Sequence, residues 1–167
     1  VTNTNGTLTY LRTASQQNSN VLLVESRDLG GNYDVHPYAL KEYEDSLLFA
    51  CGDGLYGISA RTIFSSQNVT PEFISKNKLE RKFQELNPDY KHHTKISRVK
   101  NNKYNLIFIS GTSYDAVEND RLFTAFFTKD TGFEFTEHSF RTAIAEDVTS
   151  YTFDEMIDAR GYLVLLT

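Results

Sequence analysis

The stretch Arg121–Arg141, RLFTAFFTKDTGFEFTEHSFR, carries the strongest structural signal in this 167-residue chain. Its two arms, Arg121–Lys129 and Gly132–Arg141, are rich in phenylalanine, and the short segment Asp130-Thr131-Gly132 joins them. Aromatic residues favour strands, and a short glycine-containing segment between two apolar runs favours a hairpin turn. We therefore predict an antiparallel β-hairpin here.

The same pattern recurs on both sides of this hairpin. Apolar runs bounded by Gly, Asn, Asp or Ser predict short strands, because these polar residues and glycine accept turn conformations. Arg12–Asn20 and Gly111–Asp120 are expected to be polar loops. The further strands are expected at Thr7–Leu11, Asn20–Ser26, Asp45–Cys51, Leu55–Phe64, Thr94–Val99, Tyr104–Ser110 and Tyr162–Leu166.

Two segments are expected to be helical. Thr70–Leu86 begins with a Thr-Pro pair suited to an N-cap and a first helical position, and its apolar residues recur at helical spacing. Asn77 weakens the middle of this segment, so two shorter helices are the alternative. Thr152–Arg160 begins with the spacing of a capping box and is followed by Gly161, which suits a helix C-terminus. The predicted fold is mainly β: an antiparallel twisted sheet of hairpins, as a β-sandwich or a single curved sheet, with one medium helix and one short C-terminal helix.

The length suits one domain, which we expect to span residues 1–167, with 1–7 as a flexible leader. One internal echo links Leu47–Tyr56 (LLFACGDGLY) and Leu106–Asp115 (LIFISGTSYD), since both contain a strand, a glycine and a tyrosine. The pair resembles propeller blades. A closed propeller needs at least four blades, however, and 167 residues hold too few such units, so we interpret the echo as a coincidence between similar hairpins.

Charge is unevenly distributed along the chain. The net charge is −5, yet the segment Lys76–Lys103 contains nine basic and three acidic residues. This segregation suggests either a surface that faces a polyanion or an intramolecular match to an acidic face, while a solvated helix and hairpin is the ordinary alternative. The basic residues are Lys76, Lys78, Arg81, Lys82, Lys91, Lys95, Arg98, Lys100 and Lys103.

Several classes of protein are excluded or not supported. The single cysteine, Cys51, excludes a disulfide scaffold, and its apolar neighbours predict a buried, inert thiol. No apolar run approaches the roughly 20 residues of a membrane-spanning helix, so membrane insertion is not expected. The first residue is Val1, which we interpret as a sign of processing or excision.

No catalytic or metal-binding motif is present. His92 and His93 would point to opposite faces of a strand, and the Asp115–Asp120 loop lacks the spacing of a calcium-binding EF-hand. The glycines of Gly52–Gly57 lack the Lys-Ser/Thr that completes a phosphate-binding loop. We therefore expect no cofactor, no metal and no catalytic residue. A hydrolase with an unrecognised carboxylate site remains a third alternative, and it would need a pocket that gathers a histidine and two carboxylates.

Recognition is the favoured function class. The chain is rich in Tyr, Asn, Ser and Thr, which are typical of adaptable polar binding surfaces when they lie on hairpin loops. A carbohydrate suits such a surface, because its hydroxyls need neutral donors and acceptors and its ring needs an aromatic face. The candidate ligand-binding residues near turns are Tyr33, Tyr38, Tyr56, Tyr104 and Tyr114.

At the level of class, the chain resembles the glycan-binding head domains of virus spikes, such as the proteolytically released head of the rotavirus spike. The shared features are the size, the polar N-terminal leader, the β content and the absence of disulfides, while the absence of Trp is a departure. The resemblance implies attachment to a host-cell glycan or protein receptor from a virion surface or an extracellular location. The alternative is a module that binds a nucleic acid or sulfated glycan through residues 76–103, although the acidic remainder of the chain disfavours nucleic acid.

Overall fold

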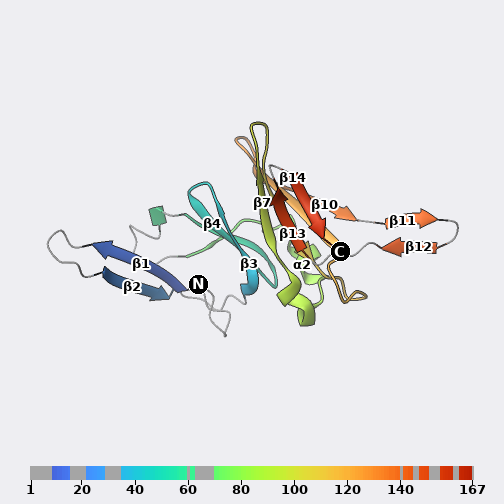
Figure 1. Cartoon of the computed structure of the whole chain (residues 1–167), viewed down its shortest axis with the longest axis horizontal. Coiled ribbons are helices and arrows are strands. Elements are labelled where there is room, and N and C mark those ends of the chain that lie inside the picture. Colours follow the sequence, from blue (N-terminus) through green and yellow to red (C-terminus); the bar gives the residue numbers. More distant parts are fainter. Residues whose placement is uncertain are drawn as a thin grey trace.

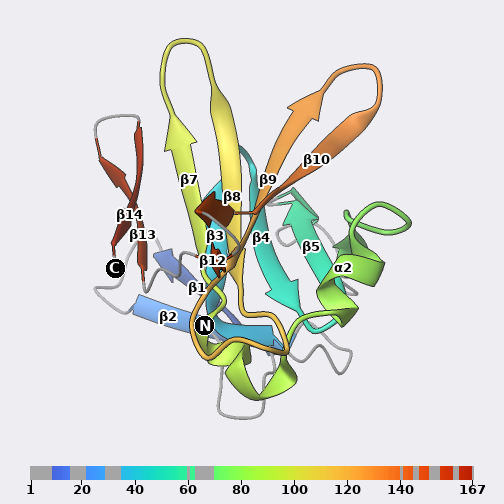
Figure 2. The ribbon, with the colours of Figure 1, turned by 90° about the vertical axis from the view of Figure 1, so that its right-hand side faces the viewer.

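The structure is a computed structural model, which describes residues 9–15, 22–28, 35–59, 61–62, 70–139, 141–144, 147–150, 155–159 and 162–166. It is mainly β, and two four-stranded antiparallel sheets form its centre (Figures 1 and 2). The first sheet contains, in spatial order, β3 (Val35–Tyr43), β4 (Ser46–Cys51), β5 (Gly54–Ser59) and β6 (Glu72–Phe73). The second sheet contains β7 (Ile96–Lys100), β8 (Asn105–Gly111), β9 (Arg121–Thr128) and β10 (Gly132–Ser139).

The other strands form three two-stranded hairpins, and two short helices connect the sheets. The hairpins pair β1 (Thr9–Ser15) with β2 (Leu22–Asp28), β11 (Arg141–Ile144) with β12 (Asp147–Ser150), and β13 (Glu155–Ala159) with β14 (Tyr162–Leu166). Helix α2 (Glu80–Gln84) and the 3-10 helix η1 (Pro88–His93) lie between β6 and β7. None of the helices in the described ranges is long and apolar enough to cross a membrane.

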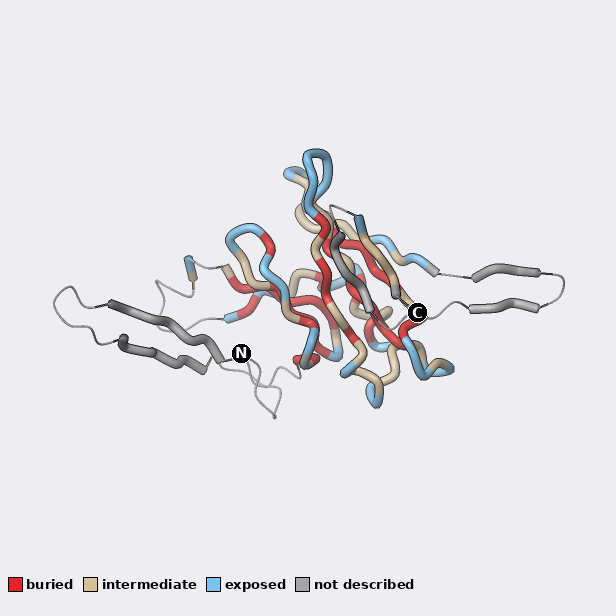
Figure 3. Tube along the Cα trace, viewed as in Figure 1, coloured by how far each residue is buried: buried red, intermediate tan, exposed pale blue. Residues whose placement is uncertain are grey.

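The two sheets share one apolar core. Strand β4 shows the reason, because Leu48 and Ala50 belong to the cluster between the sheets, while Phe49 and Cys51 lie on the opposite face. Period-two alternation therefore buries both faces of the strand, and the sequence there is an uninterrupted apolar run. Figure 3 shows the buried residues concentrated along these central strands.

The second sheet is also covered on both faces. Ile107, Ile109 and Phe123 face the first sheet within the shared core. Leu122, on the other face, packs against partly buried hydrophobic side chains that include Leu163 of β14. The layers therefore follow the chain: first sheet, second sheet, then the hairpin β13–β14.

The two sheets are topologically equivalent. Each is a meander whose strands neighbour one another in chain order, and the first strands, β3 and β7, lie side by side with a parallel bridge between Tyr38 and Lys95. The two echo segments, Leu47–Tyr56 and Leu106–Asp115, contain most of β4 and β8, which are the second strands of their sheets. The two similar segments therefore lie at equivalent positions in the two sheets.

The predicted hairpins are confirmed. The strands β4 and β5, β7 and β8, and β9 and β10 pair antiparallel, and the last strand occupies Tyr162–Leu166 as expected. The sequence analysis missed β3, and β1 extends to Ser15 through residues that were expected to form a loop. The expected leader, 1–7, lies outside the described residues.

The two helix predictions need correction. Within Thr70–Leu86 only Glu80–Gln84 is α-helical, because Glu72–Phe73 joins the edge of the first sheet as β6 and Asn77 has a φ of 62°. The ring of Phe73 stacks on that of Tyr56 with 4.5 Å between centroids, a contact that a continuous helix would forfeit.

The predicted C-terminal helix, Thr152–Arg160, is wrong because Glu155–Ala159 is the strand β13. All five of its residues pair with β14, and Leu163 and Leu165 of β14 pack against Leu122 of the second sheet. Hairpin pairing with β14, together with the packing of β14 on the second sheet, therefore overrides the local capping signal, whose first residue lies outside the described ranges.

Candidate functional site

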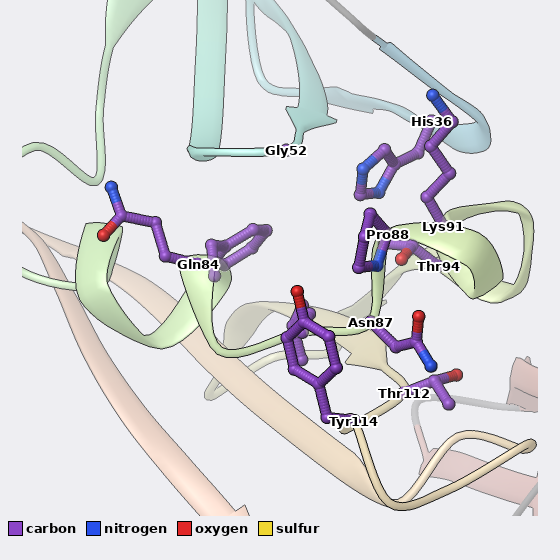
Figure 4. Close-up of a pocket in the computed structure, with 11 residues that line it drawn as sticks. His36, Gly52, Gln84, Asn87, Pro88, Lys91, Thr94, Thr112 and Tyr114 are labelled. Atoms are coloured by element: carbon purple, nitrogen blue, oxygen red, sulfur yellow. The ribbon is translucent and has the colours of Figure 1, made fainter.

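Two adjoining cavities form the candidate site, and Tyr114 borders both. The inter-sheet cavity has a volume of about 140 Å³. It lies between the first sheet, the loop that follows β8, and the helical connection, which is the segment from α2 through η1 to Thr94 (Figure 4). The outer groove, of about 730 Å³, lies beside it and shares Gln84 and Tyr114 with it. The outer groove is otherwise lined by Glu85, Ser113, Asp115, Ala116, Val117, Glu118, Asp120 and Arg121.

Residues from three parts of the fold converge on the inter-sheet cavity. The first sheet supplies His36 and the β4–β5 turn residue Gly52, and the loop after β8 supplies Thr112 and Tyr114. Figure 4 shows Tyr114 extending towards the space below that turn. The helical connection supplies the remaining residues, which are Phe83, Gln84, Leu86, Asn87, Pro88, Lys91 and Thr94.

The loop that carries Tyr114 is held in place by buried polar contacts. Asn119 is 2% exposed; its Nδ2 donates to the carbonyl oxygen of His93 at 3.0 Å, and its Oδ1 accepts from the Thr112 hydroxyl at 3.3 Å. The carboxylate of Asp120 accepts from both the backbone N–H and the hydroxyl of Ser113, at 2.8 and 2.6 Å. These bonds close the loop on itself and on η1, so the site is ordered before a ligand arrives.

Acidic groups dominate the outer groove. Asp115 and Glu118 line it, whereas its one cation, Arg121, is paired with Glu137. Burial by itself raises the pKa of Glu137, but hydrogen bonds from Arg121 and Lys82 outweigh burial and leave the pKa below its ordinary value. The positive charge of Arg121 is therefore largely compensated within the protein.

The structure separates the five candidate tyrosines. Tyr38, Tyr104 and Tyr114 are 67%, 57% and 62% exposed, but only Tyr114 lines either cavity of the site. Tyr56 is buried against Phe49 and Phe73 and donates its hydroxyl to Asp53, which corrects the expectation that it faces a ligand. Tyr33 lies outside the described residues.

Of the nine basic residues, Lys91 alone lines the inter-sheet cavity. Five of the nine pair with carboxylates: Lys78 with Glu134, Arg81 with Glu85, Lys82 with Glu85 and Glu137, and Arg98 and Lys100 with Glu44.

The sequence analysis missed Gln84, Asn87, Asn119 and His36. Asn87 precedes Pro88, a dipeptide that marks the end of a helix, and Gln84 lies one turn earlier on α2. The loop around Asn119 was considered only as a cation site. No local pattern signals His36, since the strand that carries it was itself missed.

Neither cavity of the site gathers the groups that a hydrolase would need. The inter-sheet cavity contains His36 but no carboxylate, and the outer groove contains four carboxylates but no histidine. In the part of the chain that the structure describes, no cluster of three His, Cys, Asp or Glu side chains has the arrangement of a metal site. His92 and His93 contact each other edge to face within η1, with 4.2 Å between ring centroids.

Comparison of the chain with protein-family models, with curated proteins and with solved structures finds no match in any of the three. Function is therefore inferred from the chemistry of the two cavities.

Proposed function

We propose that this chain is a non-enzymatic recognition domain that binds a neutral glycan at the two cavities around Tyr114. The observation that supports the proposal most directly is the position of Tyr114, an exposed aromatic ring that borders both cavities. A sugar presents an apolar face of C–H groups that packs on an aromatic ring, while its hydroxyls bond to neighbouring polar groups. A tyrosine shared by two cavities can contact two consecutive sugar units.

The inter-sheet cavity fits one small polar unit. Its 140 Å³ corresponds to about four or five water molecules at roughly 30 Å³ each, which is the scale of a single sugar ring. The polar residues that line it are mainly neutral: Gln84, Asn87, Thr94, Thr112 and Tyr114. Such groups both donate and accept hydrogen bonds, as sugar hydroxyls require.

The outer groove suits the continuation of a neutral chain better than a polyanion. Its carboxylates can accept hydrogen bonds from sugar hydroxyls, whereas they would repel sulfate or phosphate groups. The ion pairs made by the basic segment further weaken the polyanion alternative, because those cations already have internal partners.

The test is a glycan array followed by titration of each hit against wild type, Tyr114→Ala and Tyr104→Ala. Tyr104 is the matched control, since it is similarly exposed but lies at the β7–β8 turn, away from both cavities. Loss of ring packing and of one hydroxyl contact amounts to about 1.5–3 kcal/mol, or roughly 10- to 150-fold in affinity. Tyr104→Ala should bind as wild type does.

Two results would contradict the proposal. The first is equal affinity of the two tyrosine variants for every glycan that binds. The second is binding confined to sulfated glycans and lost steeply as salt rises, which is the signature of contacts to a polyanion.

The cellular setting remains a prediction. By the resemblance to virus spike heads, the glycan would belong to a host-cell receptor and this domain to a virion surface or an extracellular protein. Binding of the labelled chain to cells before and after enzymatic removal of surface glycans tests whether attachment depends on a glycan. Undiminished binding to the treated cells would favour a protein receptor instead.

A further inference from the structure

A third cavity lies at the end of the inter-sheet space that is opposite to Tyr114. This end groove has a volume of about 550 Å³, within the range of roughly 300–1,000 Å³ that is typical of ligand sites. Strand β4 begins at Ser46, which lines the end groove, and is followed by Gly52, which lines the inter-sheet cavity. Figure 1 shows the β3–β4 turn and the β9–β10 turn, which flank the groove, at the same end of the two sheets.

Small residues form much of the wall that the first sheet contributes. Ser46 pairs with Ser59 and Leu48 pairs with Gly57 across β4 and β5, and all four residues line the end groove. They lie on one face of the sheet, the face on which Leu48 joins the core between the sheets. Because three of the four are small, the space between the sheets is left unfilled at this end.

Aromatic rings line the other side of the end groove. Phe127 and Phe133 are paired across β9 and β10, and their rings meet edge to face with 5.5 Å between centroids. The ring of Tyr43, from β3, lies 5.5 Å from that of Phe133, so the three rings form a row. Phe127 ends the row and is 56% exposed, which leaves its ring accessible to a ligand. The face of such a ring attracts cations.

The uncompensated charge around the end groove is negative. Lys78 is the one cation among the described residues that line it, and its ammonium group is paired with Glu134 at 3.2 Å. Asp45, in the β3–β4 turn, and Glu72, on β6, also line the groove, and both are exposed. Neither makes an ion pair with any residue whose position the structure describes. The end groove therefore complements a positively charged ligand.

Arg98 shows within the protein how this groove accommodates a cation. Its guanidinium carbon lies 5.3 Å from the ring centroid of Tyr43, and its Nη2 donates to the carboxylate of Glu44 at 2.8 Å. Tyr43 and Glu44 both line the end groove. One arginine thus contacts an aromatic ring and a carboxylate at the same time, a combination that its planar guanidinium group favours. Phe127, with Asp45 and Glu72, offers the same two kinds of partner.

We propose that the end groove binds an arginine side chain of a basic peptide from a partner protein, with the guanidinium group on the ring of Phe127 and an ion pair to Asp45 or Glu72. Arginine is favoured over lysine, because its planar group both stacks on a ring and pairs with a carboxylate. The small residues of the first sheet leave room for the aliphatic stem. This contact is independent of glycan binding, since no described residue lines both the end groove and either cavity beside Tyr114.

The first test is fluorescence anisotropy at low salt with a labelled peptide of alternating Arg and Gly. The matched peptide carries citrulline in place of each arginine, which keeps the shape of the side chain and removes its charge. The arginine peptide should bind about 10-fold more tightly, because citrulline forfeits both the attraction to the ring and the ion pair. Equal affinities, or no binding of the arginine peptide at up to about 1 mM, would overturn the proposal.

Variants of Phe127 test the role of the ring. Phe127→Ala and Phe127→Leu should each weaken binding of the arginine peptide roughly 3- to 30-fold, because both remove the aromatic face. Phe127→Leu keeps a large apolar side chain, so weaker binding by this variant does not reflect unfolding. Tyr38→Ala is the control, since Tyr38 is 67% exposed and lies outside the groove. Binding of Phe127→Leu with wild-type affinity would overturn the proposal.

Paired charge variants test whether the peptide binds in this groove. Asp45→Asn with Glu72→Gln removes two negative charges from the end groove, and Asp115→Asn with Glu118→Gln removes two from the outer groove. The net charge changes equally, yet only the first double variant should weaken binding of the arginine peptide, by roughly 3- to 10-fold. An equal or larger loss with the second double variant would assign the peptide to the outer groove and overturn the proposal.

Discussion

Replacement of Asn119 by alanine tests whether the loop that carries Tyr114 is built into the core. The side chain is 2% exposed and makes two hydrogen bonds, to the carbonyl oxygen of His93 and from the hydroxyl of Thr112. Each buried polar group left without a partner costs about 1–3 kcal/mol. The His93 carbonyl keeps a bond from the Ser110 hydroxyl at 3.3 Å, so the expected loss lies near the lower end, at about 2 kcal/mol in total.

Urea unfolding measures this loss. With an m-value of about 2 kcal/mol per molar for a domain of this size, the midpoint of Asn119→Ala should fall by about 1 M at an unchanged m-value. Val117→Ala is the control on the same loop: Val117 is 64% exposed, and its replacement should change stability by no more than about 0.5 kcal/mol. Equal midpoints for the two variants would refute the view that Asn119 anchors the loop.

Two further predictions concern the sheets. Glu137→Gln should lower the free energy of unfolding by about 1 kcal/mol at neutral pH by removing its pairs with Arg121 and Lys82. The pKa of Glu137 in the folded protein lies below its ordinary value of 4.5, so the stabilisation is complete above pH 4.5 and is lost as the pH falls through the folded pKa. A difference in unfolding free energy between wild type and Glu137→Gln that persists in acid would contradict this. Gly54→Ala should lower the free energy of unfolding by about 2 kcal/mol, because the Cβ of the alanine would lie 2.3 Å from the hydroxyl oxygen of Ser75. An unchanged midpoint in urea would show that Ser75 moves aside freely.

The site could be predicted only in part from the sequence. Tyr114 was identifiable because it follows an apolar strand and lies in a polar loop, where an aromatic side chain tends to be exposed. Tyr56 follows a strand in the same way, yet it is buried, because the edge strand β6 brings Phe73 onto its ring. Local sequence does not show which face of a hairpin receives a later segment of the chain.

The basic segment, residues 76–103, is a second case in which local sequence does not show which distant residues become neighbours. Sequence alone revealed that positive charge is concentrated between residues 76 and 103, but not that Glu44 and Glu134 lie opposite it. Those carboxylates are separated from their partners by more than fifty positions along the chain. Internal pairing of these basic residues therefore depends on tertiary contacts that local sequence does not show.

The sequence by itself determined the fold class, the hairpin turns and the strands that pair across them. These features depend on residues within about ten positions of one another: period-two apolar runs, and glycine or asparagine where the chain reverses. Tertiary structure decided that Glu155–Ala159 is a strand, that the two sheets are equivalent, and that Tyr114 borders two cavities. The arrangement of the sheets and the position of Tyr114 depend on contacts between segments that are distant in the sequence, such as that of Asn119 with His93. The strand Glu155–Ala159 depends on pairing with β14 and on the packing of β14 on the second sheet, which together outweigh a local helix preference.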